Sequence, residues 1–299
     1  MFQHCLICTD FTDGLQRTIH FVSALQKGGF NKVTFFHSVP IWSEGEVPRV
    51  DREKIAEMKA KLSPALENIP DGMEVNVEVL SGSASDNIIE LTKKYDIDFI
   101  ITGSPLSNSL ENFLFGSTTS KLTKKVHIPI MVLRPQLVSV YREEELSSRF
   151  SNLNDYWLVP YQQDYAHAHD LVNKIKEYAQ DKSQQNPPKC LLLTTVDDVS
   201  RSQLIIDSNV NEAKKKLAKV KQELESVGVE VETIVKTGNH LEIVFEAALT
   251  YNISAIAIAN DRDSKLIDRI LDLTVGNDSS SLLNCSWFPI VYFPLEKTK

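Results

Sequence analysis

The chain has 299 residues, of which 42% are hydrophobic and 24% charged, with a formal net charge of −8. This length predicts about two domains. The acidic balance argues against nucleic acid as a partner, because a phosphate backbone requires a basic surface. No apolar run approaches the roughly 18 residues of a membrane-spanning helix, and the amino-terminal segment lacks signal-peptide features, so we expect a cytoplasmic protein with no membrane partner.

Short apolar runs alternate with amphipathic stretches along the first half. We expect strands at 4–9, 33–39, 73–80, 98–103 and 129–134, with helices at 13–25, 51–68, 85–95 and 118–126. Pro64 is expected to kink or end the second helix, and Ser85 to cap the third. Strands that alternate with helices predict right-handed βαβ units and a parallel sheet.

Cys5 and Cys8 form a C-x-x-C pattern inside the first expected strand. Residues three apart on a strand point to opposite faces of the sheet. We therefore expect two thiols packed in or near a core rather than a redox or zinc site.

The second half repeats the order of the first. Gly82 recurs as Gly238, and Pro129 recurs as Pro289. Strands are expected at 157–161, 190–196, 229–236, 255–259 and 289–293, with helices at 164–180, 208–227 and 243–251. A repeat of this size is a duplicated domain, since solenoid repeats are only about 20–50 residues long.

The predicted fold is therefore α/β, with two tandem, doubly wound, five-stranded parallel-sheet domains of Rossmann-like type. The first domain is expected over residues 1–135 and the second over 154–299. The segment 136–153 has weak periodicity and many charges, which indicates a linker with a short helix at 142–148.

Open parallel sheets bind ligands beyond the carboxyl ends of their strands. In the first half, the residues at these positions that carry chemistry are Asp10, His37, Val39, Gly103, Ser104, Gly116, Ser117 and Thr118. A glycine after a strand lets the backbone approach a phosphate. The helix that follows Gly116 offers free N–H groups and hydroxyl donors to an anion, with Lys121 one turn further on.

Each of these features also has a structural explanation. The Gly116-Ser117-Thr118 segment is also typical of an ordinary loop with a helix cap, and Asp10 of a cap on the first helix. Because Asp10 and Gly103 accompany this segment at the ends of other expected strands, we favour a site for a phosphate-bearing ligand.

The first half resembles the universal stress protein family. Nucleotide-binding members carry G-x-x-G, nine residues, and then Gly followed by Ser or Thr; this chain has Gly103, Leu106 in place of the second Gly, and Gly116-Ser117. Asp10, the H-x-V ending at Val39 and the run IPIMVLRP extend the resemblance. It implies a nucleotide site in which Asp10 and Val39 frame the adenine and ribose. Leu106 departs from the family pattern, and a phosphate would then be held by the Gly116 end alone.

The second half changes at the same positions. Tyr161 stands where Asp10 stood, Ala259 replaces Gly103, and Arg262 replaces Leu106. The following loop carries Asp261, Asp263, Asp268 and Asp272, which would repel a triphosphate. We expect no ATP site there, and a solvated loop rather than a metal site.

The sequence thus predicts a non-catalytic sensor or regulator that binds an adenine nucleotide such as ATP or AMP, with or without Mg²⁺, in its first domain. One alternative is a dimeric scaffold of the same fold that binds no nucleotide, and another is a slow ATP hydrolase. The resemblance implies an internal pseudo-dimer through the two last strands, IPIMVL and FPIVYF, and permits a homodimer of the whole chain.

Overall fold

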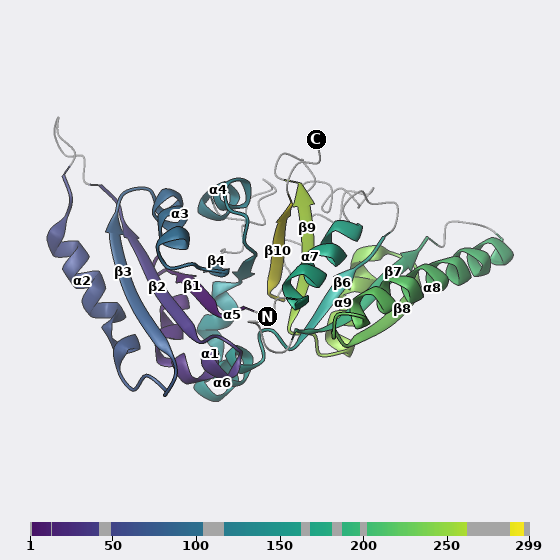
Figure 1. Cartoon of the computed structure of the whole chain (residues 1–299), viewed down its shortest axis with the longest axis horizontal. Helices are drawn as coiled ribbons and strands as arrows, with labels where there is room; N and C mark the ends of the chain where they lie inside the picture. Colours follow the sequence, from purple (N-terminus) through teal and green to yellow (C-terminus); the bar gives the residue numbers. More distant parts are fainter. Residues whose placement is uncertain are drawn as a thin grey trace. The chain divides into compact units, whose positions relative to one another are not determined.

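The computed structural model of the protein describes residues 2–12, 14–41, 49–103, 117–162, 168–180, 187–197, 202–261 and 288–295. The chain forms two compact units, Phe2–Ser151 and Asn152–Lys299. Both are α/β, as the alternating pattern predicts (Figure 1).

In the first unit the strands run parallel in the order β3-β2-β1-β4-β5. Their bounds are β1 His4–Cys8, β2 Lys32–Val39, β3 Glu74–Ser81, β4 Phe99–Gly103 and β5 Ile130–Leu133. The helices are η1 Leu15–His20, α1 Val22–Lys27, α2 Arg52–Leu62, η2 Ser63–Leu66, α3 Ala84–Lys94, α4 Ser117–Lys125, α5 Pro135–Val140 and α6 Glu143–Ser151. Figure 1 shows α3 and α4 on one side of the sheet and α1, α5 and α6 on the other, so the sheet is doubly wound.

The core of the first unit lies around its central strands. Every residue of β1 is buried, because helices cover both faces of a doubly wound parallel sheet. The ring of Phe99 in β4 stacks on Phe2 at 4.4 Å between centroids and meets Phe30 at 5.8 Å. Cys5 and Cys8 are buried free thiols, as expected, and burial raises the pKa of the Cys5 thiol well above its ordinary value.

Two helices of the first unit differ from expectation. The single helix expected at 13–25 is divided at Phe21, which leaves the helical region between η1 and α1. The Phe21 ring packs 5.5 Å from that of Phe150 on α6, a contact that local periodicity does not contain. The expected cap at Ser85 is wrong, since Ser83 precedes the first turn of α3 and Ser85 is buried inside it.

Most of the segment expected as a linker packs on the first unit. The guanidinium of Arg17 donates hydrogen bonds to the carbonyl oxygens of Val138 and Tyr141, at 2.7 and 3.0 Å. Helix α6 packs against α1, where the Phe150 carbonyl lies so close to Gly28 that a β-carbon there would come within 2.5 Å of it. Residues 135–151 are thus part of the first compact unit.

The second unit repeats this topology, with parallel strands in the order β8-β7-β6-β9-β10. Its strands are β6 Tyr156–Pro160, β7 Lys189–Val196, β8 Val231–Thr237, β9 Ala255–Asp261 and β10 Ile290–Leu295. Its helices are α7 Ala168–Gln180, α8 Gln203–Glu225 and α9 His240–Thr250. A buried apolar cluster joins α9 to β6, β7 and β9.

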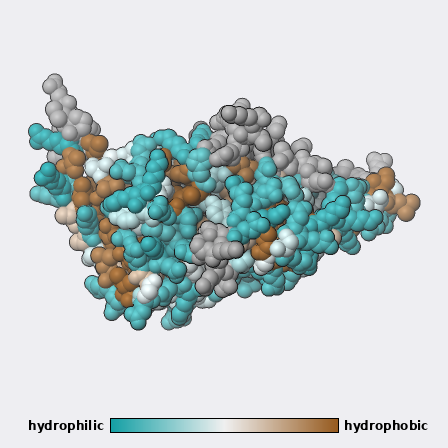
Figure 2. Space-filling model, viewed as in Figure 1, coloured by the Kyte–Doolittle hydropathy of each residue, from teal (hydrophilic) through white to brown (hydrophobic). Residues whose placement is uncertain are grey.

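Helix α8 is longer than expected, because it begins at Gln203 rather than at 208. Its buried residues, Leu217, Val220 and Leu224, all lie in its second half, where it packs on β7 and β8. Its first turn is exposed, with Leu204 at 82% of its surface accessible. Figure 2 shows a hydrophobic patch at this end of the helix on an otherwise mostly hydrophilic visible surface.

Candidate functional site at the carboxyl edge of the first sheet

The strand order of the first unit reverses at β1. The chain passes from β1 to β2 and β3 on one side, and then returns to place β4 on the other side. Cys8 lies opposite Thr102 in this parallel pair. Asp10 and Gly103 come two residues and one residue after this pair, so both lie at the carboxyl edge of the sheet. A reversal of this kind leaves a crevice at the strand ends, where α/β sheets bind ligands.

Asp10 is exposed and lies in a tight turn. Its Oδ1 accepts hydrogen bonds from the backbone N–H of Thr12 at 2.8 Å and from the Thr12 hydroxyl at 2.7 Å. Phe11, between them, has φ +65° and donates its N–H to the Thr9 hydroxyl oxygen at 3.0 Å. The Asp10 side chain therefore orders its own turn through Thr12.

His37 ties the end of β2 to the end of β1. Its Nδ1–H donates to the Thr9 carbonyl oxygen at 2.8 Å, and its ring packs edge-on against Phe11 at 4.8 Å between centroids. The ammonium group of Lys61 on α2 lies 5.7 Å from the centre of the Phe11 ring. His37 is buried, so this contact is a fixed part of the edge.

Val39, the last residue of β2, is buried, and its carbonyl oxygen accepts the N–H of Gly82 at 2.9 Å. Gly82 has φ +116°, a conformation that side-chain-bearing residues rarely adopt. The Ser38 hydroxyl donates to the Gly82 carbonyl at 2.9 Å. These bonds fix the backbone at the end of β2.

The start of α4 is held against the end of β4. The hydroxyls of Thr102 and Thr119 are both buried and lie 3.5 Å apart. Thr118, in the first turn of α4, is half-buried, and Gly103 is half-buried at the end of β4. The first turn of α4 contains no acidic residue, so its N–H groups and positive dipole end are not neutralised within that turn.

The site residues predicted from sequence therefore fall into two groups. Asp10, Val39, Gly103, Ser117 and Thr118 lie at the ends of β1, β2 and β4 and at the start of α4. Ser104, Gly116 and Leu106 lie outside the described residues, as do Arg262, Asp263, Asp268 and Asp272 of the second half.

Thr12 and Phe11 were missed by the sequence analysis. An Asp followed two residues later by Thr is a turn-forming pattern, since the carboxylate can accept the N–H of the second residue. That pattern stands in the sequence as Asp10-Phe11-Thr12 and was the signal available.

The second unit keeps the backbone bonds of this edge. Tyr161 donates its N–H to the Leu193 carbonyl, as Thr9 does to that of Phe36. The Thr194 hydroxyl donates to the Tyr161 carbonyl at 2.6 Å, replacing the bond that His37 makes to Thr9. By strand register Tyr161 therefore corresponds to Thr9, and the residue at the position of Asp10 is Gln162, not Tyr161 as the sequence indicated.

Side chains at the second edge bond to one another. The Gln162 amide donates to the hydroxyl of Thr195 and also to its carbonyl, and Thr195 Oγ1 lies 2.8 Å from Nδ1 of His240. With its oxygen accepting from Gln162, the Thr195 hydroxyl donates to His240. Burial lowers the pKa of His240, which favours the neutral imidazole that this bond needs. A neutral amide thus stands where the first unit has a carboxylate.

The described part of the chain contains no group of three or more His, Cys, Asp or Glu side chains arranged to take a metal ion. Among its helices, none has both the length and the apolar character needed to cross a bilayer.

Residues 1–134 match the model of the universal stress protein family. The stress response protein NhaX of Bacillus subtilis is 34% identical over 82 residues, and a universal stress protein of Methanocaldococcus jannaschii is 30% identical over 63 residues. These matches cover 27% and 21% of this chain and 46% and 37% of the relatives' own lengths. The match to the universal stress protein family therefore lies within the first unit, and the chain spans less than half the length of the curated relatives it matches.

Solved structures extend the likeness over both units at the level of the fold. A universal stress protein from Archaeoglobus fulgidus covers 97% of this chain and 95% of its own, with a TM-score of 0.57 at 15% identity. A putative universal stress protein from Pseudomonas aeruginosa covers 99% of this chain and 93% of its own, with a TM-score of 0.55 at 13% identity. The whole chain therefore has the fold of two tandem α/β domains.

Proposed function

We propose that this protein is a non-catalytic regulator of the stress-response type whose first unit binds an adenine nucleotide. The observation that carries the proposal is the meeting of three elements at one carboxyl edge. Asp10 follows β1 and Gly103 ends the adjacent strand β4, at the point where the sheet order reverses, and a contact between Thr102 and Thr119 holds the start of α4 at the end of β4.

The chemistry of this edge matches the parts of a nucleotide. The carboxylate of Asp10 and the backbone around Val39 would contact the base and ribose. Gly103, Ser104 and the Gly116-Ser117-Thr118 segment would contact the phosphates, with the start of α4 supplying N–H donors and a positive dipole end. Mg²⁺ bound to the phosphates would reduce their charge without a protein ligand.

The second unit serves in this proposal as a packing partner. Its edge has Gln162 in place of the carboxylate, and the amide is already bonded to Thr195. We propose that the strands β5 and β10 form the contact of an internal pseudo-dimer and that the chain acts in the cytoplasm.

The first experiment is to denature the purified full-length protein and identify any released small molecule by mass spectrometry. The proposal predicts ATP, ADP, AMP or a cyclic adenine nucleotide. Isothermal titration with each nucleotide, with and without Mg²⁺, then gives affinity and stoichiometry, and one site per chain is expected. Incubated ATP should remain unhydrolysed.

A matched pair of variants locates the site. Gly103→Val should abolish binding, whereas Ala259→Val at the corresponding position of the second unit should leave it unchanged. Binding unaffected by Gly103→Val would refute the assignment. A protein that releases no nucleotide and binds none at millimolar concentration would favour the scaffold, for which Leu106 at the family's second Gly position is the supporting observation.

A further inference from the structure

Among the described residues, Thr12 alone donates hydrogen bonds to the carboxylate of Asp10. Thr12 uses both its N–H and its hydroxyl to bond the same oxygen, Oδ1, at 2.8 and 2.7 Å. Within the described part of the chain, Oδ2 accepts no hydrogen bond. The two bonds from Thr12 therefore fix the carboxyl group through one oxygen and leave the other as an acceptor.

The turn that makes this possible is a strained one. Phe11 has φ +65°, which is rare for a bulky residue and costs about 1–2 kcal/mol. Its ring packs on His37, and its N–H bonds to Thr9, so surrounding contacts hold the strained conformation in place. Because Phe11 turns the chain back at once, Thr12 reaches the side chain of Asp10.

We propose that Thr12 is a positioning residue that orients Asp10 so that Oδ2 selects a purine bearing an amino group, as adenine does, over one bearing a carbonyl. This inference rests on the proposed function and concerns the same site. An ionised carboxylate only accepts hydrogen bonds, so it attracts the exocyclic amine of adenine and repels the carbonyl oxygen of hypoxanthine.

Orientation matters because a carboxylate that rotates freely must be immobilised when the ligand binds, and that cost reduces affinity. Thr12 removes the cost in advance. The second unit provides the internal contrast, since the amide of Gln162 is bonded to Thr195 and carries donors as well as an acceptor. Oriented by Thr195 instead, it offers no free carboxylate oxygen.

The test compares ATP with ITP, which differ in the amino and carbonyl groups of the base. Affinities are measured by isothermal titration for the full-length protein and for Thr12→Val and Thr12→Ser. Thr12→Val removes the hydroxyl donor and should weaken ATP binding about tenfold, since a hydrogen bond to a charged group is lost. ITP binding should weaken less, so the preference for ATP falls. Thr12→Ser should retain the wild-type affinity and preference.

Thr12 is exposed, so the melting temperature without nucleotide should stay unchanged in both variants. Thr195→Val, which removes the hydroxyl from the second edge, is the matched control and should not alter ATP affinity. Equal losses for ATP and ITP, or unchanged ATP binding in Thr12→Val, would overturn the inference while leaving the proposed function intact. Wild-type protein that binds neither nucleotide would refute the proposed function, and this inference with it.

Discussion

The two units place side chains of very different size at the same pair of facing positions. Cys5 and Phe99 are register partners on β1 and β4, and Trp157 and Ala255 are partners on β6 and β9. All four are fully buried. The large residue of the pair lies on the fourth strand in the first unit and on the first strand in the second unit, and its partner is small in both. A close-packed core constrains the summed volume of the pair more than the identity of each residue.

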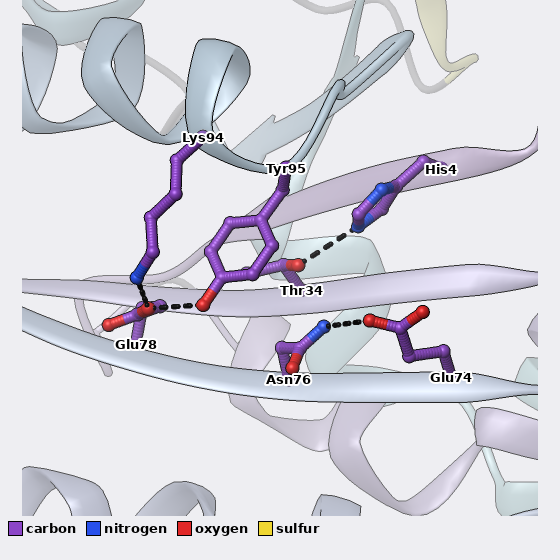
Figure 3. A network of polar contacts seen from close by, with 7 residues as sticks. All are labelled: His4, Thr34, Glu74, Asn76, Glu78, Lys94 and Tyr95. Atoms are coloured by element: carbon purple, nitrogen blue, oxygen red, sulfur yellow. Dashed lines mark hydrogen bonds and ion pairs between the residues drawn. The ribbon is translucent and has the colours of Figure 1, made fainter.

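Polar side-chain contacts on the strands also differ between the two units. In the first unit, Lys94 and the Tyr95 hydroxyl both bond to the carboxylate of Glu78, and His4 bonds to Thr34 (Figure 3). In the second unit, Tyr156 takes the register position of His4, and its hydroxyl donates to Glu232 at 3.0 Å. The two units thus share the arrangement of their strands but differ in the side-chain contacts between them.

The amino-terminal ends of β1 and β6 are also anchored differently. Asp98 accepts the backbone N–H groups of Gln3 and His4, at 2.8 and 3.0 Å. In the second unit, the Ser254 hydroxyl accepts the N–H of Tyr156 at 3.1 Å and donates to its carbonyl at 2.9 Å. The half-buried carboxylate of Asp98 thus anchors the strand in the first unit, and the neutral hydroxyl of Ser254 anchors it in the second.

The largest effect on stability should come from removing the large residue of the Cys5–Phe99 pair. Phe99→Ala removes a fully buried ring that contacts Phe2 and Phe30, and should lower the free energy of unfolding by about 3–5 kcal/mol. Adding Cys5→Trp reproduces the pair of the second unit and should restore part of that loss, as measured by urea denaturation.

The exposed Leu249→Ala change is the control and should cost less than about 0.5 kcal/mol. A double variant no more stable than Phe99→Ala would show that a large residue at position 5 cannot replace the one lost at position 99.

A smaller loss of stability is expected from changing the glycine that follows the third strand in each unit. Gly82 and Gly238 have φ +116° and +126°, and a β-carbon would meet no atom closer than 4.0 and 3.5 Å, respectively. Gly82→Ala and Gly238→Ala should therefore each cost about 1–3 kcal/mol from backbone strain alone. Chemical denaturation should give similar losses for the two, with Ser83→Ala as a nearby control. Losses that differ by more than about 2 kcal/mol would indicate that the turns at Gly82 and Gly238 are not equivalent.

A third effect is a change in the pH dependence of stability. Burial raises the pKa of Asp98 to about 6 from its ordinary 3.8, so the folded chain binds this proton more tightly than the unfolded chain does. The contribution of Asp98 to the free energy of unfolding therefore decreases as pH rises from about 4 to 6.

Asp98→Ser, which copies Ser254, should remove this decrease. Measured between pH 4 and 7, the difference in stability, wild type minus variant, should fall as pH rises and then level off above pH 6. Burial lowers the pKa of His4, but this residue is present in both proteins and largely cancels in the difference. Stability curves of wild type and Asp98→Ser that run parallel over this pH range would contradict the raised pKa of Asp98.

The sequence alone determined the order of the elements and the duplication. Apolar runs such as those of β1 and β7 mark parallel strands covered on both faces, and Gly82 and Gly238 mark the turns after β3 and β8. These signals are local, because strand periodicity and the backbone freedom of glycine depend on neighbouring residues only.

Only the tertiary structure decided what depends on distant contacts. It divided the first helix at Phe21, packed 135–151 on the first unit, and aligned Gln162 rather than Tyr161 with Asp10. The bonds from Thr12 to Asp10 are local and could have been predicted. Strand register could not, because it is fixed by hydrogen bonds and packing between segments far apart in the chain.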